Sequence, residues 1–149
     1  MRLSAAIKRL GFWLAMVVAA AAVPGEAGAQ TGKWVATITQ LSNGGGAADI
    51  TVDPRNDKQS RAKITFRNTK RDMRLAWDIV VGSCRDEGVP IAPQAAFTLV
   101  QTQMDGGGSV SANVPKLESG KKYYVRVFDP QSAATDASAY GCGNLSEQS

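Results

Sequence analysis

Apolar and polar residues alternate one by one along much of this chain, and that pattern restricts it to β-structure. Within residues 61–67, Ala62, Ile64 and Phe66 alternate with residues that are charged or carry a hydroxyl group. Because successive side chains of a strand point to opposite faces, such a segment has one apolar and one solvated face. We expect strands at residues 34–41, 48–53, 61–67, 73–81, 95–101, 109–114 and 122–128.

Turn-forming residues separate these segments, as in SNGGG at 42–46, DPRND at 53–57 and DGGG at 105–108. No segment has the 3.6-residue period of an amphipathic helix. Short strands joined by such turns predict an all-β fold, an antiparallel Greek-key β-sandwich of about 7–8 strands. No repeat divides the chain, so we expect a single domain over residues 30–149.

The first 29 residues have the pattern of a secretory signal peptide. Arg2, Lys8 and Arg9 precede an apolar run at 12–23, and small residues end at Ala29. The run of about 12 residues is too short to span a bilayer, although a retained membrane anchor is the alternative. We predict cleavage after Ala29 and export to the periplasm or the cell exterior, with no membrane span remaining after cleavage.

The chain contains no histidine, and this absence excludes whole classes of site. Histidine is the commonest metal ligand and the side chain whose unperturbed pKa lies nearest neutrality. Ser-His-Asp and Cys-His nucleophilic sites and the usual zinc and copper centres are therefore excluded. We expect no catalytic residue, no metal and no cofactor. An enzyme with a histidine-free site is the least favoured alternative.

The two cysteines, Cys84 and Cys142, both lie in the predicted exported part. An even number of cysteines in an oxidising compartment predicts a structural disulfide. A redox-active pair is the alternative, but the wide separation is not a C-x-x-C motif.

Two short motifs resemble a known group of proteins. They are WDIVVGSC at 77–84 and YGCGNL at 140–145. They are similar to the W-H-I-H-x-G-S-C and A-C-G-N-L stretches of the copper/zinc superoxide dismutase-like and CHRD (chordin-type) β-sandwiches that bacteria export. The segments MDGGGSV at 104–110 and GKKYYVRVFDP at 120–130 also resemble strand entries of that group.

The resemblance implies a β-sandwich with a disulfide that holds the C-terminal segment onto the sandwich. It also places the group's metal-ligating histidines at three positions that here carry Asp78, Val80 and Phe128. Copper needs converging imidazole nitrogens, which valine and phenylalanine do not supply. The resemblance therefore implies the fold and the disulfide without the metal site or the dismutase reaction.

Basic residues are concentrated in residues 55–74, which contain eight lysines and arginines but only two acidic residues. Arg61, Lys63 and Arg67 alternate and should share one face of a strand. The other cations are Arg55, Lys58, Lys70, Arg71 and Arg74. This stripe could bind an envelope polyanion, and Arg61, Lys63, Arg67, Lys70 and Arg71 are the candidate residues. Its alternative is a solvated face whose charges prevent strands from pairing edge to edge.

Two hypotheses of function follow. The first is an exported, non-catalytic binding or structural module that resembles the superoxide dismutase-like and CHRD domains. The second is an envelope protein that binds polyanions through the basic stripe. No aromatic residues alternate with its cations to stack on bases, which argues against nucleic acid. The sequence does not identify a partner, and a protein partner is also open.

Overall fold

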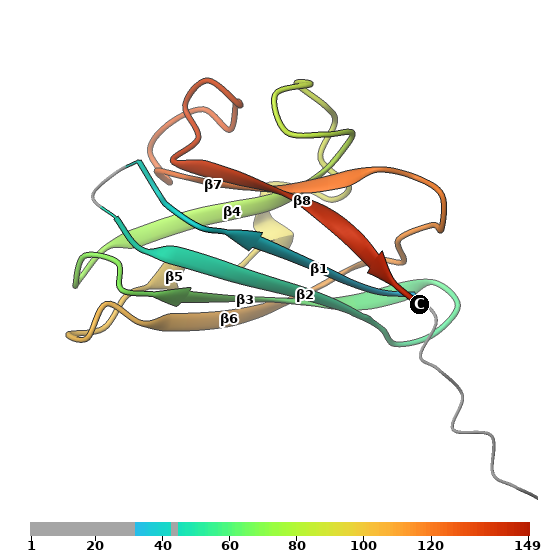
Figure 1. Ribbon diagram of the computed structural model, residues 1–149, viewed down its shortest axis with the longest axis horizontal. Coiled ribbons are helices and arrows are strands. Elements are labelled where there is room, and N and C mark those ends of the chain that lie inside the picture. The colour runs from blue at the N-terminus through green and yellow to red at the C-terminus, as the bar shows by residue number, and fades with distance from the viewer. Residues whose placement is uncertain (1–31, 43–44) are drawn as a thin grey trace, which may run out of the picture.

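The computed structural model describes residues 32–42 and 45–149. The predicted leader, residues 1–29, lies outside the described residues. Eight antiparallel strands and one short 3₁₀ helix follow one another along the chain (Figure 1). They are β1 (Lys33–Ile38), β2 (Ala47–Pro54), β3 (Gln59–Arg67), β4 (Arg74–Val81), η1 (Gln94–Ala96), β5 (Val100–Gln101), β6 (Gly108–Pro115), β7 (Tyr123–Phe128) and β8 (Gly141–Gln148).

The strands form one nearly closed sheet in the order β5-β4-β7-β8-β1-β2-β3-β6. In Figure 1, β4, β7 and β8 lie in the upper part of the view and β2, β3 and β6 in the lower part. The sheet folds over itself in this way, and its inward side chains meet in one core. The all-β prediction and the disulfide are confirmed. Within the described ranges, no helix is long and apolar enough to cross a membrane.

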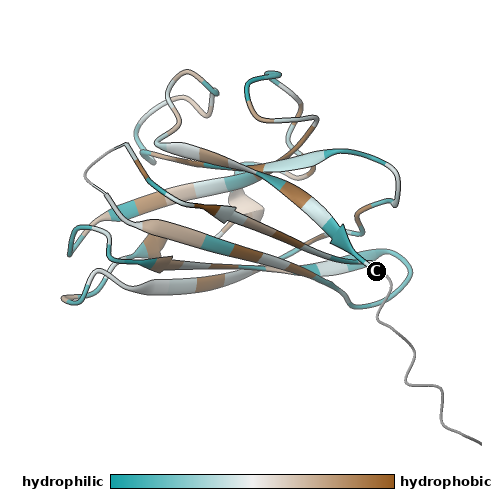
Figure 2. Cartoon of the chain, viewed as in Figure 1, coloured by the Kyte–Doolittle hydropathy of each residue, from teal (hydrophilic) through white to brown (hydrophobic). Residues whose placement is uncertain are grey.

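The core follows the alternation of the sequence. Ala62, Ile64 and Phe66 of β3 are buried, whereas Arg61 and Lys63, which alternate with them, are exposed. Brown, apolar residues recur along the strands in Figure 2, and several connecting loops are teal. The opposite wall of the core comes from alternate residues of β4 and β7, which are Leu75, Trp77, Ile79, Tyr123, Val125 and Val127. Burying such side chains is the main favourable contribution to folding.

Two segments differ from the expected strands. The expected strand at residues 95–101 instead contains the end of η1 and the two-residue β5, and between them the Thr98 carbonyl accepts a hydrogen bond from Trp77 Nε1 (2.9 Å). The strand β8 was not predicted, because only Gly143 and Leu145 of its eight residues are buried. A side chain at Gly143 would meet Ile38 of β1 at 3.1 Å, so small residues are needed there, and they remove the apolar alternation.

The turn between β3 and β4 is hydrogen-bonded to the turn between β5 and β6. The hydroxyl of Thr69, after β3, donates to the carbonyl of Gly106 (2.7 Å), and the Thr69 backbone N–H donates to the same oxygen (3.1 Å). Gly106 lies in the turn between β5 and β6 with a φ of +74°, and a Cβ there would lie 2.1 Å from the Thr69 carbonyl oxygen. Glycine is therefore required by both the backbone conformation and the contact.

We predict that Gly106→Ala destabilises the protein more than Gly120→Ala. Gly120 also has a positive φ (+81°), but nothing lies within 4 Å of its added Cβ. Both variants carry a left-handed cost of about 1–2 kcal/mol. Gly106→Ala adds about 1–3 kcal/mol for the displaced turn. Urea unfolding of the oxidised protein measures both, and equal losses would show that the Thr69–Gly106 contact does not constrain the fold.

Candidate functional site

The outward face of β4 and β7 is the most unusual part of the structure, because it is also buried. Three cross-strand pairs lie in a row on it, namely Ala76 with Phe128, Asp78 with Arg126, and Val80 with Tyr124. All six residues are at most 2% exposed. Two loops, residues 82–93 and 129–140, rise beside these strands in Figure 1. β4 and β7 are thus covered on both faces.

A buried ion pair occupies the middle of this row. Arg126 Nε donates to Asp78 Oδ1 (3.0 Å) and Arg126 Nη2 donates to Asp78 Oδ2 (2.6 Å). Both side chains are at most 2% exposed. A buried charge needs a partner with good geometry, and the two parallel hydrogen bonds supply it. Both carboxylate oxygens of Asp78 therefore have a partner within the strand pair itself.

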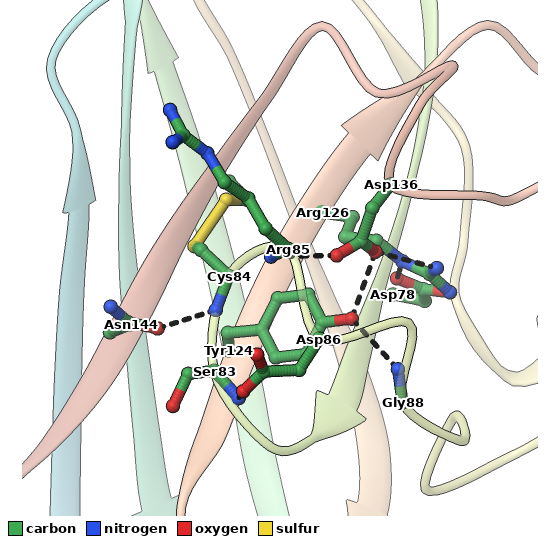
Figure 3. The surroundings of a disulfide bond; sticks show 11 residues. Asp78, Ser83, Cys84, Arg85, Asp86, Gly88, Tyr124, Arg126, Asp136 and Asn144 are labelled. Atoms are coloured by element: carbon green, nitrogen blue, oxygen red, sulfur yellow. Dashed lines mark hydrogen bonds and ion pairs between the residues drawn. A yellow bond between two sulfur atoms is a disulfide. The ribbon is translucent and has the colours of Figure 1, made fainter.

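Asp136 connects the loop after β7 to this ion pair (Figure 3). Its Oδ1 accepts from Arg126 Nη1 (3.1 Å) and from the Tyr124 hydroxyl (2.8 Å). Its Oδ2 accepts from the backbone N–H of Arg85 (2.8 Å), which lies in the other loop. One carboxylate therefore binds β7 and both covering loops together.

The loop after β4 is held at several further points. The Tyr124 hydroxyl accepts from the Gly88 N–H (3.2 Å), and the Asp136 N–H donates to Glu87 Oε1 (3.0 Å). Arg85 and Glu87 have positive φ angles of 79° and 45°. Such backbone conformations persist where surrounding contacts hold them. These hydrogen bonds are the contacts that hold the loop.

The predicted disulfide between Cys84 and Cys142 is present, with the two Cα atoms 5.9 Å apart. We expected this bond to hold the C-terminal segment onto the sandwich. However, β8 is paired with β7 on one side and β1 on the other. The disulfide instead fixes the loop after β4 to β8, together with a hydrogen bond from the Cys84 N–H to Asn144 Oδ1 (2.8 Å).

The charges of this site shift one another's pKa values. Burial raises the pKa of Asp78, against the opposing effect of Arg126. Burial also disfavours the charge of Arg126, but its hydrogen bonds to Asp78 and Asp136 outweigh it and raise the Arg126 pKa. Burial would raise the pKa of Asp136 as well, yet the hydrogen bonds from Tyr124 and Arg126 keep it below the ordinary value. Two carboxylates share one guanidinium, and the pKa is raised only for Asp78, which is the more buried of the two.

The structure places the three metal positions of the resemblance on this same face. Asp78 is bound to Arg126, and Val80 is fully buried beside Tyr124. Phe128 lies in the wall of a hollow of about 720 Å³, together with Phe97, Leu99 and Pro130. Among the described residues, no three Asp, Glu or Cys side chains lie close enough to hold a metal ion.

The residues of the predicted basic stripe are divided between a strand and the turn that follows it. Arg61, Lys63 and Arg67 project from the same face of β3. Arg67 is bound to Asp49 of β2 (2.6 Å). Lys70 and Arg71 are exposed and lie in the turn beyond β3.

Three residues of this site, Tyr124, Arg126 and Asp136, were not predicted from the sequence. A usable signal exists for Arg126, because it is a cation in the middle of the apolar run YYVRVF, as Asp78 is an acid in LAWDIVV. Opposite charges in two buried strands predict a cross-strand pair. Asp136 has no comparable signal, because it lies in a loop of alanine and serine.

No family model, curated protein or solved structure matches the chain. The site must therefore be interpreted from its own geometry.

We predict that Asp78→Asn destabilises the protein by about 3–5 kcal/mol, because it leaves the buried Arg126 with half of its charge partners. Asp53→Asn is the control, since Asp53 forms an exposed ion pair with Lys33 at 3.7 Å. Such a pair contributes about 0–1 kcal/mol. Unfolding by urea at pH 7 measures both variants. Similar small losses would show that the buried pair is not needed for the fold.

We predict that the stabilising effect of Asp136 is lost in acid. Its folded-state pKa lies below the ordinary value of 3.8, so its contribution is complete above that pH and disappears as the pH falls through the folded-state value. The difference in unfolding free energy between wild type and Asp136→Asn should therefore shrink below pH 3.8. Asp57→Asn, which removes a carboxylate from the exposed turn after β2, is the control measured over the same pH range. A constant difference for Asp136→Asn would contradict the prediction.

Proposed function

We propose that this chain is an exported, non-catalytic binding or structural module. In this proposal it resembles the superoxide dismutase-like and CHRD β-sandwiches in fold and disulfide but has no metal site. The all-β sheet and the Cys84–Cys142 bond support the proposal. Disulfides persist in oxidising compartments, so this bond is compatible with export.

One observation carries the proposal. Where the resemblance expects an imidazole, the strand carries Asp78, and both oxygens of this carboxylate accept hydrogen bonds from Arg126. A metal ion at this place would have to displace a guanidinium and would then lie beside its positive charge. Val80 and Phe128 offer no donor atom. The chemistry of these side chains therefore favours an ion pair over a metal.

The closure of the site also argues against catalysis. Asp78 and Arg126 are each 1% exposed, so a substrate has no access to them. The pKa of Arg126 is raised and that of Asp136 is lowered, which moves both groups away from neutrality. Burial raises the pKa of Asp78, but both of its oxygens accept hydrogen bonds from Arg126. General acids and bases work best with a pKa near the ambient pH. This buried cluster is suited to joining loops and strands.

The test uses the full chain expressed with its leader in a Gram-negative host and without a histidine tag, which would itself bind metal. We expect the exported protein to begin at Gln30 and to have the mass of a chain with one disulfide. After incubation with copper and zinc salts and removal of unbound ions, we expect metal far below one equivalent per chain.

Stoichiometric copper or zinc would overturn the proposal, above all if Asp78→Asn abolished the binding. A chain retained in the cytoplasm with its leader would overturn the export part alone. Measured superoxide dismutation by the purified protein would contradict the non-catalytic assignment.

A further inference from the structure

A basic surface on the opposite side of the fold is independent of the buried ion pair. Arg61 and Lys63 project outward from β3 and are exposed. The register places Lys63 between Thr51 of β2 and Ser111 of β6, and Arg61 between Asp53 and Asn113. The cations are thus flanked by side chains with hydroxyl, carboxylate and amide groups.

The two acids of β2 on this surface are already paired with other cations. Asp49 binds Arg67 (2.6 Å), and Asp53 lies 3.7 Å from Lys33. Among the described residues, none of the ion pairs includes Arg61, Lys63 or Arg55. These three cations therefore retain their charge for an external anion.

The three cations meet at one hollow. It has a volume of about 530 Å³ and is lined by Asp53, Pro54, Arg55, Arg61, Lys63 and Ser111. Arg55 comes from the β2–β3 turn, where its N–H donates to the Gln59 carbonyl (2.9 Å). Asn56 Oδ1 accepts from the N–H groups of Lys58 and Gln59 (2.9 Å each), which fixes the turn. The third cation is therefore presented by an ordered turn.

We infer that this surface, the β3 basic hollow, binds an acidic polysaccharide. A carboxylate or sulfate group would be bound by Arg55, Arg61 and Lys63, because guanidinium and ammonium groups form strong charge-assisted hydrogen bonds with such anions. Sugar hydroxyls would meet the polar side chains on either side, since Ser111, Thr51 and Asn113 can donate or accept hydrogen bonds. The inference goes beyond the proposed function and does not depend on the absence of a metal.

Two other anionic partners fit the surface less well. The outward side chains of β2, β3 and β6 include no aromatic ring on which a base could stack. Membrane-surface binding needs apolar side chains beside the cations. The large exposed apolar residues of the described chain are Val81, Val89 and Met104. Val81 ends β4 and Val89 lies in the loop after it, whereas Met104 lies in the turn at the far end of β3 and β6 from Arg61.

The test measures binding of the oxidised protein to immobilised heparin and polygalacturonate over a series of salt concentrations. We expect affinity to fall linearly with salt on a log–log scale, as for other polyanions. The variant R61Q/K63Q should lose at least about tenfold in affinity and show a shallower slope, because two charged contacts are removed. Its unfolding curve should match wild type, since both side chains face solvent.

The matched control is K70Q/R71Q, which removes the same charge from the turn beyond β3. It should retain wild-type affinity within about twofold, because only non-specific attraction changes. Equal losses in the two double variants would overturn the inference, since a general charge effect would then explain binding. No retention of wild type on either polysaccharide would overturn it as well. Tighter binding to duplex DNA or to anionic phospholipid vesicles would assign the hollow to a different partner.

Discussion

The guanidinium of Arg126 is held between two carboxylates, and this arrangement determines how β4, β7 and the loop after β7 pack. Asp78 binds it within the strand pair, and Asp136 binds it from the covering loop. A lone cation in this position would be strongly unfavourable, because it is removed from water. The loop must therefore bring its carboxylate to the strands, and the burial of this face and the position of the loop depend on each other.

The Tyr124 hydroxyl extends this arrangement toward the disulfide. It donates to Asp136 and accepts from the Gly88 N–H, so it links the two covering loops through one oxygen atom. The Cys84–Cys142 bond holds the loop after β4 to β8. A short chain has a limited apolar core, and crosslinks of this kind add to its stability. Covalent and polar contacts thus order loops that bury few apolar side chains.

Sequence patterns predicted the strands that have one apolar and one polar face. The alternation of Ala62, Ile64 and Phe66 locates β3 because one face of that strand meets water. The sequence also located β4 and β7, whose two faces are both buried, but it failed for two other segments. In β8 close approach to β1 requires small residues, and in residues 95–101 the Thr98 carbonyl accepts a hydrogen bond from Trp77. These contacts join residues distant in sequence, so no local pattern predicts them.

The candidate sites divide in the same way. Exposure of Arg61 and Lys63 follows from strand period alone, whereas the pairing of Arg67 with Asp49 depends on which strands are neighbours. The resemblance placed Asp78 at a metal position, and its partner Arg126 was missed because the pairing of β4 with β7 was not predicted. The register of β4 and β7 is therefore needed to recognise Asp78 as one half of an ion pair.

The pairing of Asp78 with Arg126 also has a consequence for how sequences of this kind can diverge. Replacing either residue alone leaves a buried charge with fewer partners, while replacing both by apolar residues removes much of that cost. Because small proteins are only marginally stable, a sequence carrying the single change lies close to the limit of folding. The two positions are therefore expected to change together, and Asp136 with them. Divergence at this face is governed by strong epistasis among three residues, two of which lie far from the third in sequence.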